Sequence, residues 1–469
     1  MARIIVAGGG ICGSAAALML ARDGHDVTVL ERDGGPVPAS VEAAWDEWDR
    51  RSVAQFRFAH VMLARGHRVL AGELPDVVDR LAVNGGLHYN PVELMLRKIP
   101  GATREPEDDR FDTVTGRRSS IEWALATTLA DEPNVTVRRG SPVAGLVAGD
   151  AVIPGVPHVT GVRLADGEIV SADLVIDATG RRSPTIDWIT ELGGQAPIEA
   201  AEDSGFMYVG RFYRSADGSV PEFRAPVLTP LGSISVLCIA SDNGTWATTL
   251  YAASSDAPMR RLRTPEVFDR VIRECPLHAH WIDGEPISEL SSMSGVVDRT
   301  RRFVVDDVPV VTGMLSIADA HACTNPSIGR GMTLGLMHTV VMRDAVRTYI
   351  ESPVELAKAF DQATVAEIDP WHAATRDLDR RRIALMEAAV EGRQPELDPA
   401  EKIGAALLAA TRLDEQAARW FGEIQGCLAF PMDVLSREGA IDHLLAVTGG
   451  EAPIPIPGPD RQRLLDLVS

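Results

Sequence analysis

The chain is poor in cysteine and has no long apolar run. Its five cysteines are scattered and never form a Cys-x-x-Cys pair, so neither a disulfide framework nor a zinc site is expected. The N-terminus lacks the basic start and small-residue cleavage site of a signal peptide. The apolar stretches are too short to span a membrane. We therefore expect a cytoplasmic protein with reduced thiols, no metal and no membrane span.

Positive charge is scarce as well. The 469 residues include 46 basic and 66 acidic ones, which gives a formal net charge of −20. Nucleic acids and anionic membranes require a basic footprint, so neither is expected as a partner. Hydrophobic residues make up 45% of the chain and charged residues 24%, which excludes extended disorder. The length suits two or three structural regions.

The first thirty residues show a strand–turn–helix–strand pattern. Arg3–Ala7 is an apolar strand, and a glycine turn follows it. Helical periodicity runs from Ser14 to Asp23 and stops at Gly24, a favourable helix-ending residue. His25–Glu31 is a second apolar strand. The order predicts a parallel βαβ unit.

The glycine turn matches the spacing GxGxxG. Gly8 permits the tight turn, Gly10 lets the backbone approach a pyrophosphate, and Gly13 lets the helix pack closely on the sheet. Glu31 ends the second strand, where its carboxylate can accept hydrogen bonds from a ribose. We expect a dinucleotide to contact this unit at Gly8, Gly10, Ile11, Cys12, Gly13, Glu31 and Arg32.

Later segments repeat the alternation and then change character. Leu63–Val83 and Arg118–Asp131 are predicted helices, and Val310–Ile317 is a predicted buried strand. Between Ser204 and Ala253 apolar and polar residues alternate between turn signals, which predicts an antiparallel sheet. The residues after about 346 are predominantly helical in pattern.

Three further segments decide which dinucleotide is expected. They are Asp177-Ala178-Thr179-Gly180, the stretch from Ala318-Asp319 to Gly335, and the helix start Arg118-Ser119-Ser120-Ile121. Together with the glycine turn they resemble motifs of the group A flavoprotein monooxygenases, the p-hydroxybenzoate hydroxylase superfamily. The sequence departs from the family pattern at Ala318, where glycine is usual, and at Ile121, where leucine is usual.

The resemblance implies that FAD is the cofactor. Asp319 would bind the ribitol or ribose of FAD, Arg118 would reach its phosphates, and a helix N-terminus would face the flavin. The residues implied in FAD binding beyond the glycine turn are Arg118, Val143, Asp177, Gly180, Asp319, Pro326, Gly329, Gly331 and Met332.

The segment from Val53 to Gly66 resembles one in actinobacterial polyketide epoxidases and hydroxylases. That resemblance places Gln55, Arg57 and His60 at the flavin edge, whereas the alternative is a surface loop with one satisfied histidine. Catalytic residues are not fixed by the sequence, and the candidates are His60, His321, Asn325 and Pro326.

Substrate contacts are also expected on one predicted strand. Arg211 and Tyr213 lie two apart and share a face, while Tyr208 falls on the opposite face. Either face lines the substrate pocket if it covers the flavin. The substrate candidates are Gln55, Arg57, Tyr208, Arg211 and Tyr213.

Two absences bear on the reaction. No second GxGxxG unit exists, so electrons would come from transiently docked NAD(P)H or from a partner flavin reductase. Flavin-dependent halogenases have a Trp-x-Trp-x-Ile-Pro segment and a lysine that this chain lacks near residues 50–80. Halogenation is therefore a weaker alternative.

The sequence predicts an α/β fold: a Rossmann-like FAD-binding domain with an inserted antiparallel β-sheet substrate domain and a helical C-terminal region. The FAD-binding domain takes residues 1–186, with an excursion at 76–109, and resumes at 296–345. The substrate domain is 187–295 and the helical region 346–469.

The predicted function is FAD-dependent monooxygenation of a small, secondary-metabolite substrate of the kind made in antibiotic biosynthesis. The resemblance implies oxygen transfer from a flavin C4a-hydroperoxide to hydroxylate or epoxidise the substrate, with molecular oxygen as co-substrate. The alternatives are an FAD-dependent reductase of isoprenoid-type double bonds and a flavin-binding regulatory protein without turnover. A monomer or homodimer is expected.

Overall fold

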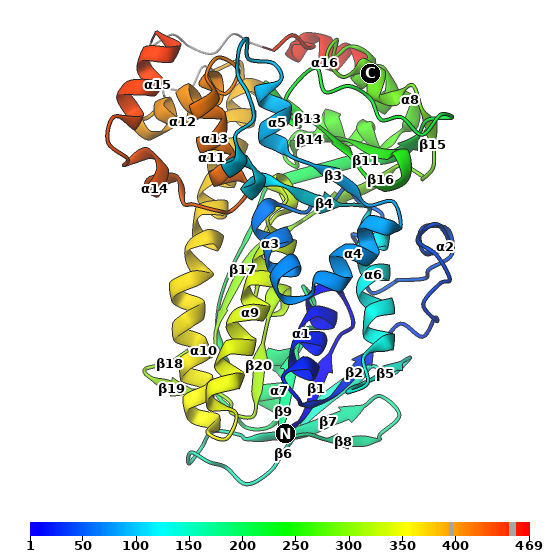
Figure 1. Cartoon of the computed structure of the whole chain (residues 1–469), viewed down its shortest axis with the longest axis vertical. Helices are drawn as coiled ribbons and strands as arrows, with labels where there is room; N and C mark the ends of the chain where they lie inside the picture. The colour runs from blue at the N-terminus through cyan, green and yellow to red at the C-terminus, as the bar shows by residue number, and fades with distance from the viewer. Residues whose placement is uncertain (394–396, 450–455) are drawn as a thin grey trace.

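A parallel β-sheet forms the core of one half of the molecule. The computed structural model describes residues 1–393, 397–449 and 456–469. The sheet has five strands, all parallel, and β1 lies at its centre (Figure 1). In spatial order the strands are β20 (Met314–Ser316), β9 (Leu174–Asp177), β1 (Arg3–Ala7), β2 (Asp26–Glu31) and β5 (Val135–Arg139).

Helices cover this sheet as the alternating pattern predicts. Helix α1 (Ile11–Arg22) starts three residues earlier than expected, directly after the glycine turn. Helix α6 (Arg118–Asp131) has the predicted bounds. Both pack with helix α9 (Gly331–Tyr349) into one apolar core with the sheet, because their small and aliphatic side chains are almost fully buried.

Two predicted elements are wrong in detail. The single helix expected over 63–83 is two helices, α3 (Ala64–Glu73) and α4 (Pro75–Val83). The break falls at Pro75, because proline cannot donate a helical hydrogen bond and clashes with the preceding turn. The strand expected from Val310 begins only after Gly313, whose φ of +73° turns the chain.

The second half of the molecule contains an antiparallel sheet. Its strands are β12 (Leu228–Leu231), β13 (Ile234–Ala240), β14 (Thr245–Ala253), β11 (Phe206–Arg214), β15 (Glu285–Pro286) and β16 (Ser291–Ser294). One face packs on helices α8 (Pro265–Arg273) and α16 (Arg461–Val468). The predicted fold class, a Rossmann-like sheet with a separate antiparallel sheet and C-terminal helices, is confirmed.

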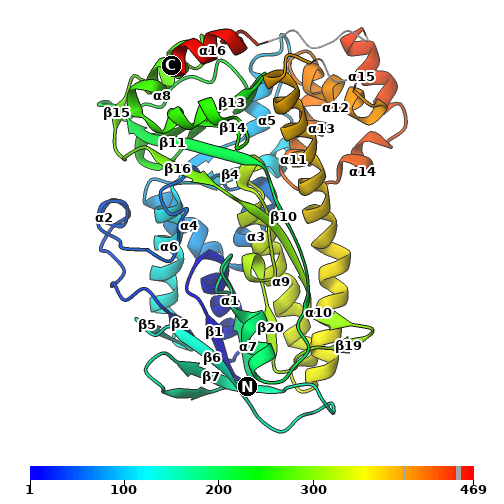
Figure 2. The same cartoon turned by 180° about the vertical axis from the view of Figure 1, so that it is seen from behind.

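A pair of long strands that the sequence did not predict connects the two halves. Strand β10 (Ile198–Asp203) pairs antiparallel with β17 (Val297–Arg302), and the pair runs along the molecule between the two sheets (Figure 2). Most β10 side chains are exposed, so the strand lacks the apolar alternation that would have signalled it.

The C-terminal third is helical. Helices α9 and α10 (Pro353–Glu367) run beside the parallel sheet, and α11 (Asp369–Val390) continues toward the antiparallel sheet (Figures 1 and 2). Helices α12 (Pro399–Ala410), α13 (Glu415–Gln425), α14 (Pro431–Leu435) and α15 (Ala440–Thr448) pack together at this end. Residues 394–396 and 450–455 of the predicted helical region lie outside the described residues. Within the described ranges, no helix is long and apolar enough to cross a membrane.

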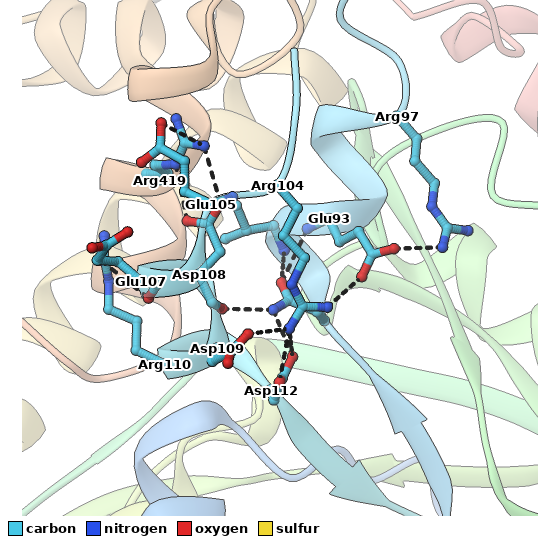
Figure 3. A network of polar contacts seen from close by, with 12 residues as sticks. Glu93, Arg97, Arg104, Glu105, Glu107, Asp108, Asp109, Arg110, Asp112 and Arg419 are labelled. Atoms are coloured by element: carbon cyan, nitrogen blue, oxygen red, sulfur yellow. Dashed lines mark hydrogen bonds and ion pairs between the residues drawn. The ribbon is translucent and has the colours of Figure 1, made fainter.

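An ion-pair network ties the excursion after residue 85 to the C-terminal helices (Figure 3). The Nε of Arg419 on α13 donates to Asp108 Oδ1 at 2.9 Å, and Asp108 is fully buried. Arg104 contacts three carboxylates, those of Glu93 on α5 (Pro91–Leu96), Asp109 within the short helix at 106–111 and Asp112 directly after it. The excursion is thereby fixed against α13.

One buried ion pair joins the two halves directly. Arg117, the residue before α6, contacts Asp242 in the β13–β14 turn with an Nη2–Oδ2 distance of 2.7 Å, and both side chains are fully buried. Ser120 and the Arg117 backbone N–H also donate to this carboxylate. Burial favours the neutral acid, but the bonds from Arg117 hold the pKa of Asp242 below its usual value.

Replacing Asp242 with asparagine should destabilise the protein strongly. The change leaves the Arg117 charge buried without its full partner, which costs about 3–5 kcal/mol of unfolding free energy. Urea unfolding followed by circular dichroism measures the loss. The control is Glu168→Gln, which removes one partner of the exposed Arg138–Glu168 pair and should leave stability unchanged. Equal stability of the two variants would contradict the structural role of Asp242.

Candidate FAD and substrate site

A single large cavity runs from the glycine turn to the antiparallel sheet and the C-terminal helices. Its volume is about 1420 Å³, above the roughly 300–1,000 Å³ of ordinary ligand pockets. It therefore has room for a dinucleotide and a second molecule in one connected space. All seven residues predicted from the glycine-turn unit line it: Gly8, Gly10, Ile11, Cys12, Gly13, Glu31 and Arg32.

The glycines of the turn serve different purposes. Gly8 has a φ of +108°, and a Cβ there would lie 2.4 Å from the Ala178 carbonyl oxygen. A Cβ on Gly13 would lie 2.0 Å from the Gly8 oxygen. A Cβ on Gly10 would meet no atom of the described residues within 4 Å. The Gly10 backbone therefore faces open space at the N-terminus of α1. Two glycines permit the packing and the third leaves a cradle that fits a pyrophosphate.

Glu31 is held in place by an arginine that the sequence analysis missed. Its Oε2 accepts from the Gly9 N–H at 2.9 Å and lies 3.1 Å from Nη1 of the buried Arg50. Burial raises the pKa of Glu31, but Arg50 and the backbone N–H groups of Asp33 and Gly9 together outweigh burial, so the pKa falls below its usual value. Glu31 is thus an ionised acceptor at the cavity wall. Nothing in the local sequence distinguishes Arg50 from its exposed neighbour Arg51.

Asp319 also lines the cavity, and its surroundings suit a cofactor. Among the described residues, no side-chain hydrogen bond involves its carboxylate, which leaves both oxygens free to accept hydroxyls. Burial raises its pKa, while the charges of Arg181, Arg118 and Arg299 oppose that shift. A carboxylate flanked by arginines fits a ligand that carries both hydroxyls and phosphates.

Ala318, the departure from the family pattern, adopts the left-handed conformation that glycine would favour, with φ +50°. Its N–H donates to His338 Nδ1 at 3.1 Å, and this bond holds the turn. A Cβ on Gly335 of α9 would lie 3.1 Å from the Ala318 methyl group and 2.5 Å from Cys12 Sγ. The bare Gly335 therefore makes room for both side chains.

Asp177 does not line the cavity, although the resemblance assigned it to FAD. It is 1% exposed, and it accepts from the Thr179 N–H, from Ser183 Oγ and from Ser316 Oγ. These bonds shape the turn that brings Gly180 to the cavity wall. The other residues implied in FAD binding all line the cavity: Arg118, Val143, Gly180, Asp319, Pro326, Gly329, Gly331 and Met332.

His60 lines the cavity as a satisfied, neutral histidine. Its Nδ1 lies 2.9 Å from the Phe58 carbonyl oxygen and donates to it, so Nε2 is the acceptor 3.3 Å from Arg118 Nη1. Burial lowers the pKa of His60 to about 3. Gln55 also faces the cavity, but Arg57 does not line it and instead stacks over the Trp45 ring at 4.9 Å.

The two remaining catalytic candidates besides Pro326 lie behind the wall. His321 is 2% exposed, stacks on Phe303 and has a pKa lowered by burial to about 3. Asn325 is fully buried; its Oδ1 accepts from the Tyr208 hydroxyl and its Nδ2 donates to Asp379 at 3.1 Å. Asn325 therefore acts on the cavity only through Tyr208.

The substrate candidates on β11 separate by face. Tyr208 lines the cavity and makes an edge contact with the Tyr251 ring at 4.6 Å. Arg211 and Tyr213 do not line it, because they lie on the opposite face of β11. There Tyr213 stacks on Trp246 inside the core that α8 covers. Alternation along the strand predicted this separation but not which face meets the cavity.

Comparisons with known proteins agree with this geometry. Residues 3–181 match the family model described as FAD dependent oxidoreductase. The match confirms the prediction of an FAD-dependent oxidoreductase. Over 445 residues the chain is 26% identical to Protein Rv3254 of Mycobacterium tuberculosis, covering 89% of this chain and 88% of that protein.

Solved structures share the fold at low identity. PqsL, a probable FAD-dependent monooxygenase from Pseudomonas aeruginosa, superposes with a TM-score of 0.58 at 16% identity, over 89% of this chain and 98% of that one. The Diels-Alderase PyrE3 of pyrroindomycin biosynthesis gives 0.60 at 16% identity, over 90% and 80%. The predicted resemblance to group A flavoprotein monooxygenases is thus confirmed in the fold.

Replacing Asp319 with alanine should weaken FAD binding about ten- to hundredfold, because one charge-assisted hydrogen bond to a cofactor hydroxyl is lost. Titration of apoprotein with FAD, followed by flavin fluorescence, gives the dissociation constant. Asp150→Ala, an exposed carboxylate outside the cavity, serves as the control. If both variants bind FAD like the unaltered protein, Asp319 does not contact the cofactor.

Stability should fall with pH below about 6.5, the usual histidine pKa. Burial lowers the pKa of His321 to about 3 and that of His372 to about 4. Below that pH these histidines are protonated in the unfolded chain but stay neutral in the folded chain. Each therefore lowers the free energy of unfolding by up to about 1.4 kcal/mol per pH unit. Above that range the contribution is fully present.

His321→Phe isolates one of these groups, because neither ring nitrogen of His321 has a hydrogen-bond partner among the described residues that the change would leave unpaired. The free energy of unfolding is measured at about pH 7.5 and at about pH 5.5. Its decrease between the two should be smaller in the variant than in the unaltered protein. An identical pH dependence would mean that His321 titrates normally in the folded state.

Proposed function

We propose that the protein is an FAD-dependent monooxygenase that hydroxylates or epoxidises an organic secondary metabolite. One observation carries the proposal: the glycine turn and the apolar face of the antiparallel sheet open into the same cavity. A molecule held under the sheet would therefore share an enclosed space with the cofactor rather than reach it from bulk water.

The residues at the glycine-turn end fit FAD. The cradle at Gly10 suits the pyrophosphate, Glu31 suits a ribose, and Asp319 with Arg118 suits the ribityl chain and phosphates. When bound and reduced, FAD would supply the activation of dioxygen. The positive N-terminus of α9, which begins at Gly331, would favour negative charge on the cofactor.

The chain's own residues would orient the substrate and exclude water. The chamber wall beneath the sheet is apolar and aromatic, with Leu237, Tyr251 and Met293 among its members. Tyr208 presents a ring whose hydroxyl is already bonded to Asn325, so its position is fixed. His60 and His321 are both neutral, but His60 is hydrogen-bonded to Phe58 and the buried His321 does not line the cavity. Positioning in a dry site is the contribution these residues make.

The electron source completes the proposal. The chain has one glycine fingerprint, which the FAD site uses. We propose that NAD(P)H docks transiently or that a separate flavin reductase delivers electrons. Molecular oxygen is the co-substrate, and the enzyme works as a monomer or homodimer in the cytoplasm.

The test uses chemically reduced holoenzyme, so that no reductase is needed. Mixed with isotopically labelled dioxygen and metabolite fractions from the source organism, it should yield an organic product that carries the label. Mass spectrometry detects that product, and the Asp319→Ala variant prepared without FAD should give none. A product that gains two hydrogens would contradict the proposal and indicate a reductase. A product isomeric with its substrate would also contradict it and indicate a cyclisation catalyst.

A further inference from the structure

The end of the cavity formed by the C-terminal helices is basic, in a chain whose net charge is −20. The charged side chains lining this end are Lys98, Arg224, Arg381, Arg382, Arg412 and one acid, Glu401. Glu401 is engaged in capping helix α12, where its Oε2 accepts from the Asp398 N–H at 2.7 Å. Such a local excess of positive charge attracts anions and raises their concentration at the opening.

Arg382 differs from the other four cations because its side chain is mostly buried in the cavity wall, whereas theirs are exposed. Its side chain is 16% exposed, and its guanidinium lies 5.2 Å from the Phe206 ring centroid and 5.8 Å from that of Tyr251. Both Nη atoms are buried and have no hydrogen-bond partner among the described residues. Buried donors are nearly always paired in proteins, so two unpaired Nη atoms beside a cavity wall mark a guanidinium whose charge the chain does not fully compensate.

Asp379 lies near Arg382 but does not fill that role. The Arg382 Nη1–Asp379 Oδ1 distance is 3.5 Å, and the pair makes no hydrogen bond. Asp379 instead accepts from Ser327 and from Asn325. Burial raises the pKa of Asp379, while Ser327, Arg382 and Asn325 oppose that shift. The Nη donors of Arg382 therefore stay without a hydrogen-bond partner among the described residues.

The walls around Arg382 are apolar and open to the cavity. Leu385 on the same helix is 41% exposed and Leu408 on α12 is 39% exposed, and both line the cavity together with Met386. Exposed leucines that gather around one opening are typical of a site for an apolar ligand. The basic opening suits a ligand with a negative charge, and the apolar walls suit a ligand with an apolar body.

We propose that the substrate is a predominantly apolar organic acid whose ionised carboxyl or enol oxygen is bound by Arg382. This inference rests on the proposed function, because it names the substrate class of that same cavity. The rings of Phe206 and Tyr251 contact the guanidinium, and its positive charge at the cavity wall favours a ligand that carries a negative oxygen. Arg381 and Arg412 at the opening attract the anion, and the leucines bind its apolar body.

Binding to oxidised holoenzyme tests the proposal without turnover. The probes are 1-pyrenebutanoate and its uncharged amide, which share size and apolar body, and calorimetry measures both affinities. The acid should bind about ten- to hundredfold more tightly than the amide, as expected for a charge-assisted hydrogen bond. Arg382→Met should abolish that preference while the amide binds as before, and Arg382→Lys should restore part of it.

The matched control is Arg380→Met on the same helix, which removes the same charge from an exposed site paired with Glu202. It should keep the preference for the acid. Equal binding of acid and amide by the unaltered protein would overturn the substrate class. A preference that persists in Arg382→Met would overturn the assignment to Arg382. No oxygen or reductant enters the experiment, so a failure to transfer oxygen would contradict the proposed function and leave this result unaffected.

Discussion

The buried pair of Arg117 and Asp242 is the contact on which the geometry of the cavity depends. Arg117 directly precedes Arg118, which lines the cavity near Asp319, whereas Asp242 belongs to the turn between β13 and β14. A charged pair this deeply buried is costly unless every partner is in place, so it specifies one arrangement of the two halves. The same contact therefore fixes the antiparallel sheet relative to the half that carries the glycine turn.

The polar groups behind the cavity wall also fix one arrangement of their neighbours through buried hydrogen bonds. Asp177 organises the turn that carries Gly180, His338 holds Ala318 in its left-handed conformation, and Asn325 orients Tyr208. None of the three contacts the cavity directly, yet each fixes a residue that does. Saturated buried networks of this kind give a wall with few alternative conformations. Arg382 departs from this pattern, because both of its Nη atoms lack a hydrogen-bond partner among the described residues.

Local sequence was sufficient wherever the chemistry of a site lies within one supersecondary unit. The strand, turn and helix at residues 3–22 follow from apolar periodicity and from glycines that steric contacts require. The start of α6 at Arg118 and the turn at Ala318-Asp319 followed from motif spacing. In these segments the contacting atoms are close in sequence, so composition and spacing carry the information.

Tertiary structure decided everything that depends on which surfaces meet. Alternation along β11 separated Tyr208 from Tyr213, but only the packing of α8 and α16 on one face determined that Tyr208 faces the cavity. Arg50 and Arg382 gave no local signal, because their partners lie in segments distant in sequence. By itself the sequence determined the strand–glycine-turn–helix unit and the fold class. The enclosed cavity arose only when β11, α11 and α12 bordered one space, since burial and charge compensation are properties of the assembled fold.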